Sequence, residues 1–485
     1  MKTILDFFRK DRFLVILIIG MMLLRIPSLM EPNWYGDEGI YLVMGQAFRS
    51  GLTWYRDIHD NKPPLLYLLA TLAGSVAYFR LILLFWMVVT MGVFAKLLAK
   101  LNVVGNSRNI ALVLFTLLTT VPVIEGHIAN AEIFMILPTL IGVILALQGG
   151  KRNNFLSGIF FGLAVLFKMP ALFEFAGVFG FLFLLDKARW SRIPMIIGFI
   201  LPIALSIAYY FLIGAGMEYL GAAFFQNIGY LSSWRTGSMT KSGISTQSGL
   251  MVRGIILVVL ALWSLLVGKK QNMNYRVVVG WYFFALFGAL LSERPYPHYL
   301  LQIVAPLTIL VGMVSWKLRV RFGILLVALL LLISGIVKYK FYFYDTFGYY
   351  QKFITNVLQS ENSSEWGEYF DRKVGRTKNL ASYLRENTNK NEKILVWADE
   401  PFVFIQSETL PLTKYMVAYH IVDFQAKEMV IKQMESNPPR FVVWPTTEGR
   451  DFAELSAILD RDYAIAERFG DARVYLRTKQ PSENK

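Results

Sequence analysis

Residues 34–64 combine acidic, basic and histidine side chains directly after the first apolar run of a hydrophobic chain. Asp37 and Glu38 form an adjacent carboxylate pair in this segment. Charged groups beside a membrane are energetically costly and therefore tend to mark functional sites. A carboxylate such as Asp37 can act as a general base that deprotonates an acceptor hydroxyl, while Glu38 can orient its neighbour. The alternative role for these acids is to stabilise the N-terminus of a helix that begins near Gly36.

Lys62 precedes two consecutive prolines in the same segment. The prolines stiffen the turn and would hold the ammonium group at the level of the lipid headgroups, where it suits a lipid phosphate. The alternative is an interfacial lysine whose aliphatic stem lies along apolar surface. Arg294 and Lys168 are candidates for the same anion. Lys168 lies between apolar residues, where an unpaired charge is costly, so it either pairs with Glu174 or meets a phosphate.

Other ionisable and aromatic side chains fall far apart in the sequence but on the same predicted side of the membrane. They are His59, Asp60, Glu125, Glu132, His298 and Tyr299. For each residue alone, a solvated polar loop is the simpler interpretation. Together they favour one site, in which we expect His59, Asp60, His298 and Tyr299 to bind substrate. The carboxylates and histidines also permit a divalent cation, although they lack the close spacing of a typical metal motif.

Membrane helices are the elements that must position these groups. The chain of 485 residues is 55% hydrophobic and has a mean hydropathy of +0.46. Its apolar residues fall in runs of roughly 17–25, the length of a helix that crosses a bilayer. This composition excludes a soluble enzyme. The absence of cysteine excludes disulfides and thiolate metal sites.

The net charge of +15 is not distributed as a nucleic-acid-binding face would require. From residue 339 onward there are 20 Lys or Arg and 21 Asp or Glu residues, whereas residues 1–338 hold 29 basic and 13 acidic ones. The excess lies in short loops between apolar segments, which is the positive-inside pattern of membrane proteins. We therefore expect membrane lipids as partners and no nucleic acid.

Alternating basic and acidic loops predict a polytopic α-helical membrane domain over residues 1–338, with a cytoplasmic N-terminus and about eleven transmembrane helices. The predicted spans are 13–29, 80–98, 109–124, 132–148, 155–169, 170–185, 193–213, 250–267, 276–291, 299–315 and 322–338. The pair at 155–185 meets at a Lys-Met-Pro turn and is alternatively partly re-entrant.

The first outer loop, residues 31–79, is expected to contain helices that lie along the membrane interface. A separate span at 65–79 would invert the side assigned to every later loop. Arg80 would then anchor the next helix among the lipid headgroups. The initial apolar run lacks a small-residue cleavage site and is expected to remain as the first helix.

Residues 339–485 predict a small soluble α/β domain on the outer side of the membrane. The segment 341–353 has the composition of an interfacial aromatic belt. After it, KILVWAD and RFVVWP have the pattern of strands, and NLASYLRENTN and FAELSAIL have that of helices. YAIAERF and ARVYLR predict a hairpin around Gly470. No glycine-rich phosphate loop occurs in this part of the sequence, so nucleotide binding is not assigned.

With these residues in place, the chain resembles the bacterial membrane glycosyltransferases of the GT-C fold. This group, similar to glycosyltransferase family 39, includes protein O-mannosyltransferases and lipid A aminoarabinose transferases. The most specific matches are DEGIY, beginning at Asp37, and HDNKPP, beginning at His59. Looser matches are GLAVLF before Lys168, the segment from Arg294 to Pro306, and the start of the soluble domain. The resemblance covers nearly the whole chain.

The resemblance implies a multi-pass enzyme of the plasma (inner) membrane that uses a polyprenyl-phosphate-linked sugar donor on the outer leaflet. An outer-loop aspartate, here Asp37, activates the acceptor hydroxyl, and the sugar configuration inverts. Lys62, with Arg294 or Lys168, holds the leaving lipid phosphate. The family also uses a second acid, and either Glu125 or Glu132 can fill that role. The sugar, a hexose or pentose, and the acceptor, a lipid, glycan or protein, stay open.

Two other classes of function compete with an enzyme. A transporter or flippase of a lipid-linked glycan precursor would also carry charges near a membrane, but such proteins usually contain paired halves with internal symmetry. The sequence contains no such duplication, and the acidic first loop favours an enzyme. A structural assembly factor for envelope polysaccharide is the third possibility if Asp37 takes no part in catalysis.

Overall fold

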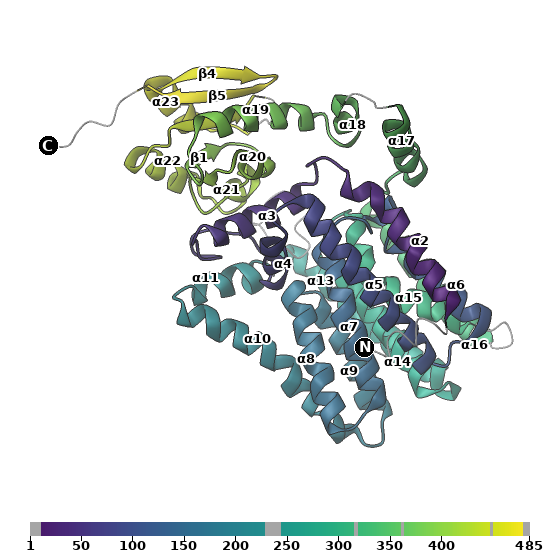
Figure 1. Cartoon of the computed structure of the whole chain (residues 1–485). Coiled ribbons are helices and arrows are strands. Elements are labelled where there is room, and N and C mark those ends of the chain that lie inside the picture. The colour runs from purple at the N-terminus through teal and green to yellow at the C-terminus, as the bar shows by residue number, and fades with distance from the viewer. Residues whose placement is uncertain (1–10, 228–243, 315–318, 360–362, 447–449, 479–485) are drawn as a thin grey trace.

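The computed structural model describes residues 11–227, 244–314, 319–359, 363–446 and 450–478. A bundle of helices forms the larger part of the molecule, and a smaller unit of helices and strands rests on one end of it (Figure 1). We call this smaller part, residues 373–478, the C-terminal unit.

Six segments of the described residues are long and apolar enough to cross a membrane. Four of them are the helices α2 (Arg12–Leu29), α5 (Val76–Lys100), α7 (Ala131–Gln148) and α16 (Arg319–Tyr339). The other two, Arg189–Leu212 and Leu250–Lys270, contain α10 (Pro194–Leu212) and most of α13 (Ile244–Val267). The chain is therefore a membrane-integral helical protein.

The remaining predicted spans also contain helices, but these have only 13 to 17 residues. They are α6 (Gly105–Leu118), α8 (Lys151–Phe167), α9 (Ala171–Leu185), α14 (Met273–Ala289) and α15 (Leu301–Met313). A helix needs about 20 residues to cross a hydrocarbon core of ~30 Å. Length therefore does not establish these helices as crossings, and the count of about eleven stays a prediction.

Glycines allow close helix packing inside the bundle. Where α8 meets α10, a Cβ atom on Gly158 would collide with the carbonyl oxygen of Met195, and one on Gly198 would collide with that of Phe155. Small residues let two helix backbones approach, and this close van der Waals packing drives helix association in a membrane. The contact holds α8 in place, and α8 ends at the cavity described below.

The first outer loop contains two short helices, α3 (Gly36–Arg49) and α4 (Leu65–Ala73). With nine residues, α4 is too short to cross a bilayer. Arg80, in the first turns of α5, is 1% exposed and lies 2.7 Å from Glu31 and 2.6 Å from Glu38. The expectation that Arg80 anchors its helix among the lipid headgroups is therefore wrong, because buried acids of the same loop hold its guanidinium.

The C-terminal unit contains a five-stranded sheet with the order β2-β1-β3-β5-β4. Its strands are β1 (Lys393–Val396), β2 (Leu410–Pro411), β3 (Phe441–Pro445), β4 (Tyr463–Phe469) and β5 (Ala472–Arg477). β1 is parallel to β2 and β3, whereas β5 is antiparallel to β3 and β4. Around the sheet lie α19 (Lys373–Asn387), α20 (Phe402–Ser407), α21 (Ala418–Asp423), α22 (Lys427–Ser436) and α23 (Ala453–Asp462). The chain reaches α19 from the bundle through α17 (Thr346–Gln359) and α18 (Ser363–Phe370) (Figure 1).

The C-terminal unit rests on the first outer loop. The backbone N–H of His59 donates a hydrogen bond of 2.8 Å to the carbonyl of Lys414. The side chain of Gln46, in α3, donates one of 2.9 Å to the carbonyl of Thr409. Near the start of α3, a Cβ atom on Gly39 would meet the side chains of Pro401 and Phe402, so the C-terminal unit also lies close to Asp37.

Candidate functional site

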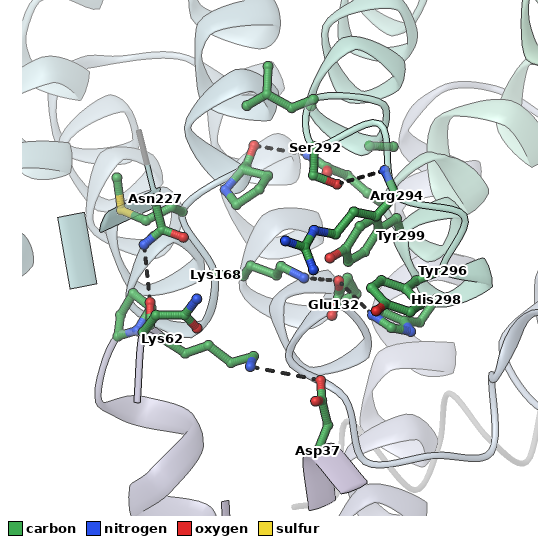
Figure 2. A pocket seen from close by; sticks show the side chains of 18 of the residues that line it. Asp37, Lys62, Glu132, Lys168, Asn227, Ser292, Arg294, Tyr296, His298 and Tyr299 are labelled. Carbon is green, nitrogen blue, oxygen red and sulfur yellow. Dashed lines mark hydrogen bonds and ion pairs between the residues drawn. The ribbon is translucent and has the colours of Figure 1, made fainter. Parts of the chain in front are cut away.

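A cavity of about 830 Å³ lies where the first outer loop, the ends of the bundle helices and the C-terminal unit meet. Its wall includes the turn from α8 to α9 and the segment that follows α14. The charged and histidine residues that the bundle and outer loop contribute are Asp37, Lys62, Glu132, Lys168, Arg294 and His298. Figure 2 shows these side chains around one space, with Asp37 and Lys62 on one side and Arg294 and His298 on the other. The fold therefore gathers residues that are far apart in the sequence.

Asp37 occupies the first turn of α3, where a carboxylate suits the helix dipole. Its Oδ2 accepts a hydrogen bond of 2.9 Å from the Tyr41 hydroxyl and lies 3.8 Å from Lys62 Nζ. Burial would raise the pKa of Asp37, but the charges of Lys62 and His298 outweigh it and hold the pKa below its usual value. The carboxylate is therefore ionised at neutral pH, as a general base must be. Its side chain is 34% exposed and so can reach a ligand.

Lys62 is fixed at the cavity by its neighbours. Its backbone N–H donates to the Tyr67 hydroxyl and its carbonyl accepts from the Tyr55 hydroxyl, both at 2.9 Å. Its Nζ lies 3.6 Å from Asp60 Oδ2 and 3.8 Å from Asp37 Oδ2. Asp60 itself is 1% exposed and accepts a hydrogen bond of 2.7 Å from Tyr67. Asp60 is thus placed to orient Lys62 from behind the cavity wall, and it is not among the residues that line the cavity.

Lys168 ends α8 in an extended conformation, immediately before the turn to α9. Its Nζ forms an ion pair with Glu132 of α7 and lies 4.4 Å from the centre of the Tyr299 ring. Glu174, the alternative partner, instead accepts a hydrogen bond of 2.7 Å from Trp281. The pairing of Lys168 with Glu174 is therefore wrong, and Lys168, Glu132 and Tyr299 all line the cavity.

Arg294 and His298 belong to the segment between α14 and the short helix η7 (Pro297–Leu300). Figure 2 shows the Arg294 side chain extending into the cavity from the side opposite Lys62. His298 Nδ1 pairs with Glu125, and its Nε2 lies 3.7 Å from Glu132 Oε1. Glu125 is fully buried and does not line the cavity. It reaches the cavity through two lining residues, His298 and Tyr35, whose hydroxyl donates a hydrogen bond of 2.6 Å to it.

Glu38 lies outside the cavity although it follows Asp37 directly. Its two carboxylate oxygens accept hydrogen bonds of 2.9 and 2.6 Å from Arg80. Its Oε1 also accepts one of 3.0 Å from the backbone N–H of Ala129. Glu38 is therefore placed to position α3 against α5 and the next outer loop, and it has no contact with the cavity.

His59 also lies outside the cavity. It is 3% exposed, and its ring packs 5.1 Å from the rings of Tyr415 and Phe424 in the C-terminal unit. Burial lowers the pKa of His59 to about 3, so the ring is neutral at physiological pH. This position suits a contact between the two parts of the molecule.

Five cavity residues from the C-terminal unit are absent from the sequence-based set. They are Asp399, Tyr419, His420, Asp423 and Arg450. The one available signal is that Asp399 follows the carboxyl end of β1, which in α/β sheets is the edge where ligands bind. Nothing in the sequence relates that edge to the membrane helices.

A metal site is not apparent in the described part of the chain. No group of three or more His, Asp or Glu side chains there is arranged to hold an ion. Instead, Asp37 and Glu132 each lie beside an ammonium group, of Lys62 and Lys168 respectively. The divalent cation therefore stays a prediction from the sequence.

Comparisons with known proteins place the chain by its fold. Neither the protein-family models nor the curated protein sequences give a match. ArnT from Cupriavidus metallidurans in the apo state is similar over 96% of this chain and 98% of that chain, with 13% identity and a TM-score of 0.57. The Archaeoglobus fulgidus oligosaccharyltransferase, in its complex with Zn and sulfate, is similar over 89% of this chain and 67% of that chain, with 14% identity and a TM-score of 0.51. The GT-C fold that the sequence motifs indicated is thereby confirmed.

Proposed function

We propose that the protein is a membrane glycosyltransferase that moves a sugar from a polyprenyl-phosphate donor to an acceptor hydroxyl. The observation that carries the proposal is the cavity, in which the ionised and partly exposed carboxylate of Asp37 shares one space with three cations of the bundle and outer loop. The cations are Lys62, Lys168 and Arg294. Apolar side chains of the α8–α9 turn and of the end of α14 complete this part of the wall and suit an isoprenoid chain. The GT-C fold supports the same class of reaction.

In the proposed reaction, Asp37 accepts the proton of the acceptor hydroxyl as the hydroxyl oxygen attacks the anomeric carbon. The bond between that carbon and the phosphate oxygen breaks, and its electron pair leaves with the lipid phosphate. Attack on the face opposite the leaving group inverts the configuration. The products are the new glycoside, polyprenyl phosphate and protonated Asp37, which then loses its proton to water.

The cations stabilise the charge that develops on the departing phosphate. Fixed charges do this most effectively where water is scarce, because they need not reorganise during the reaction. Asp60 holds Lys62 in place, and Glu132 holds Lys168. Both ammonium groups are therefore ordered before a ligand binds, which reduces the entropic cost of reaching the transition state.

The same geometry supports a reaction on the outer leaflet of the plasma membrane. The exposed residues Lys151 and Arg152 begin α8, and Lys168 ends it at the cavity. Short basic loops favour the cytoplasmic side. The C-terminal unit lies at the other end of the bundle (Figure 1). This unit and the cavity that it lines together with Lys168 are accordingly assigned to the outside.

The test compares Asp37→Asn with Asp57→Asn in cells that lack the native gene. Asp57 is a matched control because it lies in the same loop, pairs with Arg56 and does not line the cavity. Mass spectrometry of envelope lipids, glycans and secreted proteins identifies the sugar that disappears without the gene. Asp57→Asn should restore that product, whereas Asp37→Asn should lower turnover about 100-fold or more.

A second measurement separates catalysis from folding and binding. Purified Asp37→Asn in nanodiscs should retain its affinity for undecaprenyl phosphate. An envelope product at the normal level in Asp37→Asn cells would refute the base role of Asp37. Transport of a lipid-linked glycan without formation of any new glycosidic bond would instead favour the flippase.

A further inference from the structure

The C-terminal unit forms a wall of the cavity that the proposed lipid-phosphate chemistry does not use. Tyr419, His420 and Asp423 come from α21, Asp399 follows β1, and Arg450 precedes α23. These residues lie beside the same space as Asp37 and Lys62. A ligand whose phosphate meets the cations would therefore present its remaining groups to this wall.

An internal ion pair holds the wall together. Asp399 Oδ2 lies 2.5 Å from Arg450 Nη2, and Asp399 Oδ1 accepts a hydrogen bond of 2.9 Å from the backbone N–H of Tyr419. The carboxylate of Asp399 and the guanidinium of Arg450 balance each other's charge, and the hydrogen bond to Tyr419 fixes the beginning of α21. The orientation of His420 and Asp423 thus depends on a rigid support.

His420 lines the cavity and carries a buried polar atom without a hydrogen-bond partner among the described residues. The residue is 2% exposed, and its Nε2 lies 3.9 Å from Asp60 Oδ1. Within the described part of the chain, Nδ1 has no hydrogen-bond partner. Burial lowers the pKa of His420 to about 4, so the ring is neutral at pH 7. A buried polar atom without a partner costs about 1–3 kcal/mol, which a ligand hydroxyl would relieve.

Asp423 gives the wall an acceptor. It is half-buried, and burial raises its pKa while Arg294 and Arg450 lower it in part. The wall therefore holds one balanced ion pair, one further acid and one neutral histidine, with no excess of positive charge. This set disfavours phosphate. It suits hydroxyl groups, which donate to carboxylates and either donate to or accept from an imidazole.

We propose that this wall is a carbohydrate subsite in which Asp423 and His420 bind the hydroxyl groups of a sugar ring and thereby select the sugar that reacts. The inference rests on the proposed function and specifies its substrate recognition. The ring belongs either to the lipid-linked donor or to a saccharide acceptor, since both present the same hydroxyl chemistry. Asp423 is the better residue to test, because the buried His420 also contacts the outer loop.

The experiment measures ligand binding to the purified full-length protein in nanodiscs. The probes are undecaprenyl phosphate, a panel of undecaprenyl-phosphate-linked monosaccharides, and free mono- and disaccharides. The variants are Asp423→Ala and, as a matched control, Asp460→Ala, which alters an exposed aspartate of α23 outside the cavity. Asp423→Asn keeps the shape of the side chain and serves if the alanine variant fails to fold.

In the parent protein, one sugar should increase binding. Either a lipid-linked monosaccharide should bind more tightly than undecaprenyl phosphate alone, or one free saccharide should bind more tightly than the others. Asp423→Ala should reduce that binding about 10- to 100-fold, as expected for hydrogen bonds to a charged group, with a smaller loss in Asp423→Asn. Neither variant should change the affinity for undecaprenyl phosphate, and Asp460→Ala should change nothing. A loss confined to lipid-linked sugars identifies the donor, and one confined to free saccharides identifies the acceptor.

Two results would overturn the subsite. One is a parent protein that binds bare and sugar-bearing lipids equally and binds no free saccharide. The other is equal sugar binding in Asp423→Ala and Asp460→Ala. Failure of the proposed function is distinguishable from both, because no new glycosidic bond would then depend on the protein in the Asp37→Asn and Asp57→Asn comparison described above.

Discussion

Replacing Lys62 with methionine removes an ammonium group that lies beside two carboxylates and leaves an unbranched side chain of similar length. Lys62 Nζ is 3.8 Å from Asp37 and 3.6 Å from Asp60. Burial and the charge of Asp60 raise the pKa of Asp37, whereas Lys62, His298 and the hydrogen bond from Tyr41 lower it. Lys62 has the largest lowering effect, so its removal must raise the pKa of Asp37.

The separation of the two charges sets the magnitude. At 3.8 Å, Coulomb's law gives about 1 kcal/mol in bulk water and about 4 kcal/mol at an effective dielectric constant of ~20. Because the Asp37 side chain is 34% exposed, solvent screening favours the lower part of this range. We expect an increase of about one pKa unit, equivalent to ~1.4 kcal/mol. Loss of the phosphate contact should also weaken lipid-phosphate binding by roughly 10- to 100-fold.

The assay is the pH dependence of kcat/KM in nanodiscs, with the donor that envelope mass spectrometry identifies. A protonated base is inactive, so the rate falls as pH decreases through the pKa of Asp37. In Lys62→Met this acidic limb should move about one unit to higher pH. Lys378→Met, at an exposed position of α19, is the control and should match the parent. An acidic limb that stays in place while undecaprenyl phosphate binding weakens would refute the electrostatic coupling of Lys62 to Asp37.

Two further predictions concern the elements that support the site. Glu38→Gln leaves the buried Arg80 with one acidic partner fewer, so the free energy of unfolding should fall by about 3 kcal/mol. Thermal unfolding in detergent measures this, and an unchanged midpoint with lost activity would contradict a positioning role. Gly158→Ala should lower the midpoint by an amount equivalent to about 1–3 kcal/mol, because the added methyl group collides with the carbonyl of Met195. Gly180→Ala adds a methyl group in open space and should leave the midpoint unchanged.

Local chemistry explains which parts of the site could be predicted from the sequence. Asp37 lies in the first helical turn, as its Gly-Asp-Glu context indicated, and Lys62 lies at the proline turn. Both positions depend on short-range backbone preferences that a few neighbouring residues determine. Six of the predicted spans coincide with helical segments of the described residues that are long enough to cross a bilayer, because the length of an apolar run reflects bilayer thickness directly.

Partners across the fold could not be predicted in this way. Glu38 pairs with Arg80, 42 residues away, and Lys168 pairs with Glu132, 36 residues away, although Glu174 is nearer in the sequence. Glu38 was grouped with Asp37 because the two residues are adjacent in the sequence. Successive residues of a helix point in different directions, however, so Glu38 does not share the cavity with Asp37. Which ions meet inside a bundle depends on helix packing, and the periodicity of a single chain does not encode that packing.

One buried carboxylate, that of Asp60, lies between the C-terminal unit and the proposed phosphate site. Asp60 Oδ2 lies 3.6 Å from Lys62 Nζ, and Asp60 Oδ1 lies 3.9 Å from His420 Nε2. Burial would raise the pKa of Asp60, but Lys62 and His420 hold it below its usual value, so Asp60 keeps its charge. A unit that merely covered the bundle would not need to place an imidazole against the carboxylate that orients Lys62. The imidazole of α21 and the ammonium group of Lys62 therefore lie beside the same carboxylate, which places the proposed sugar wall next to the proposed phosphate site.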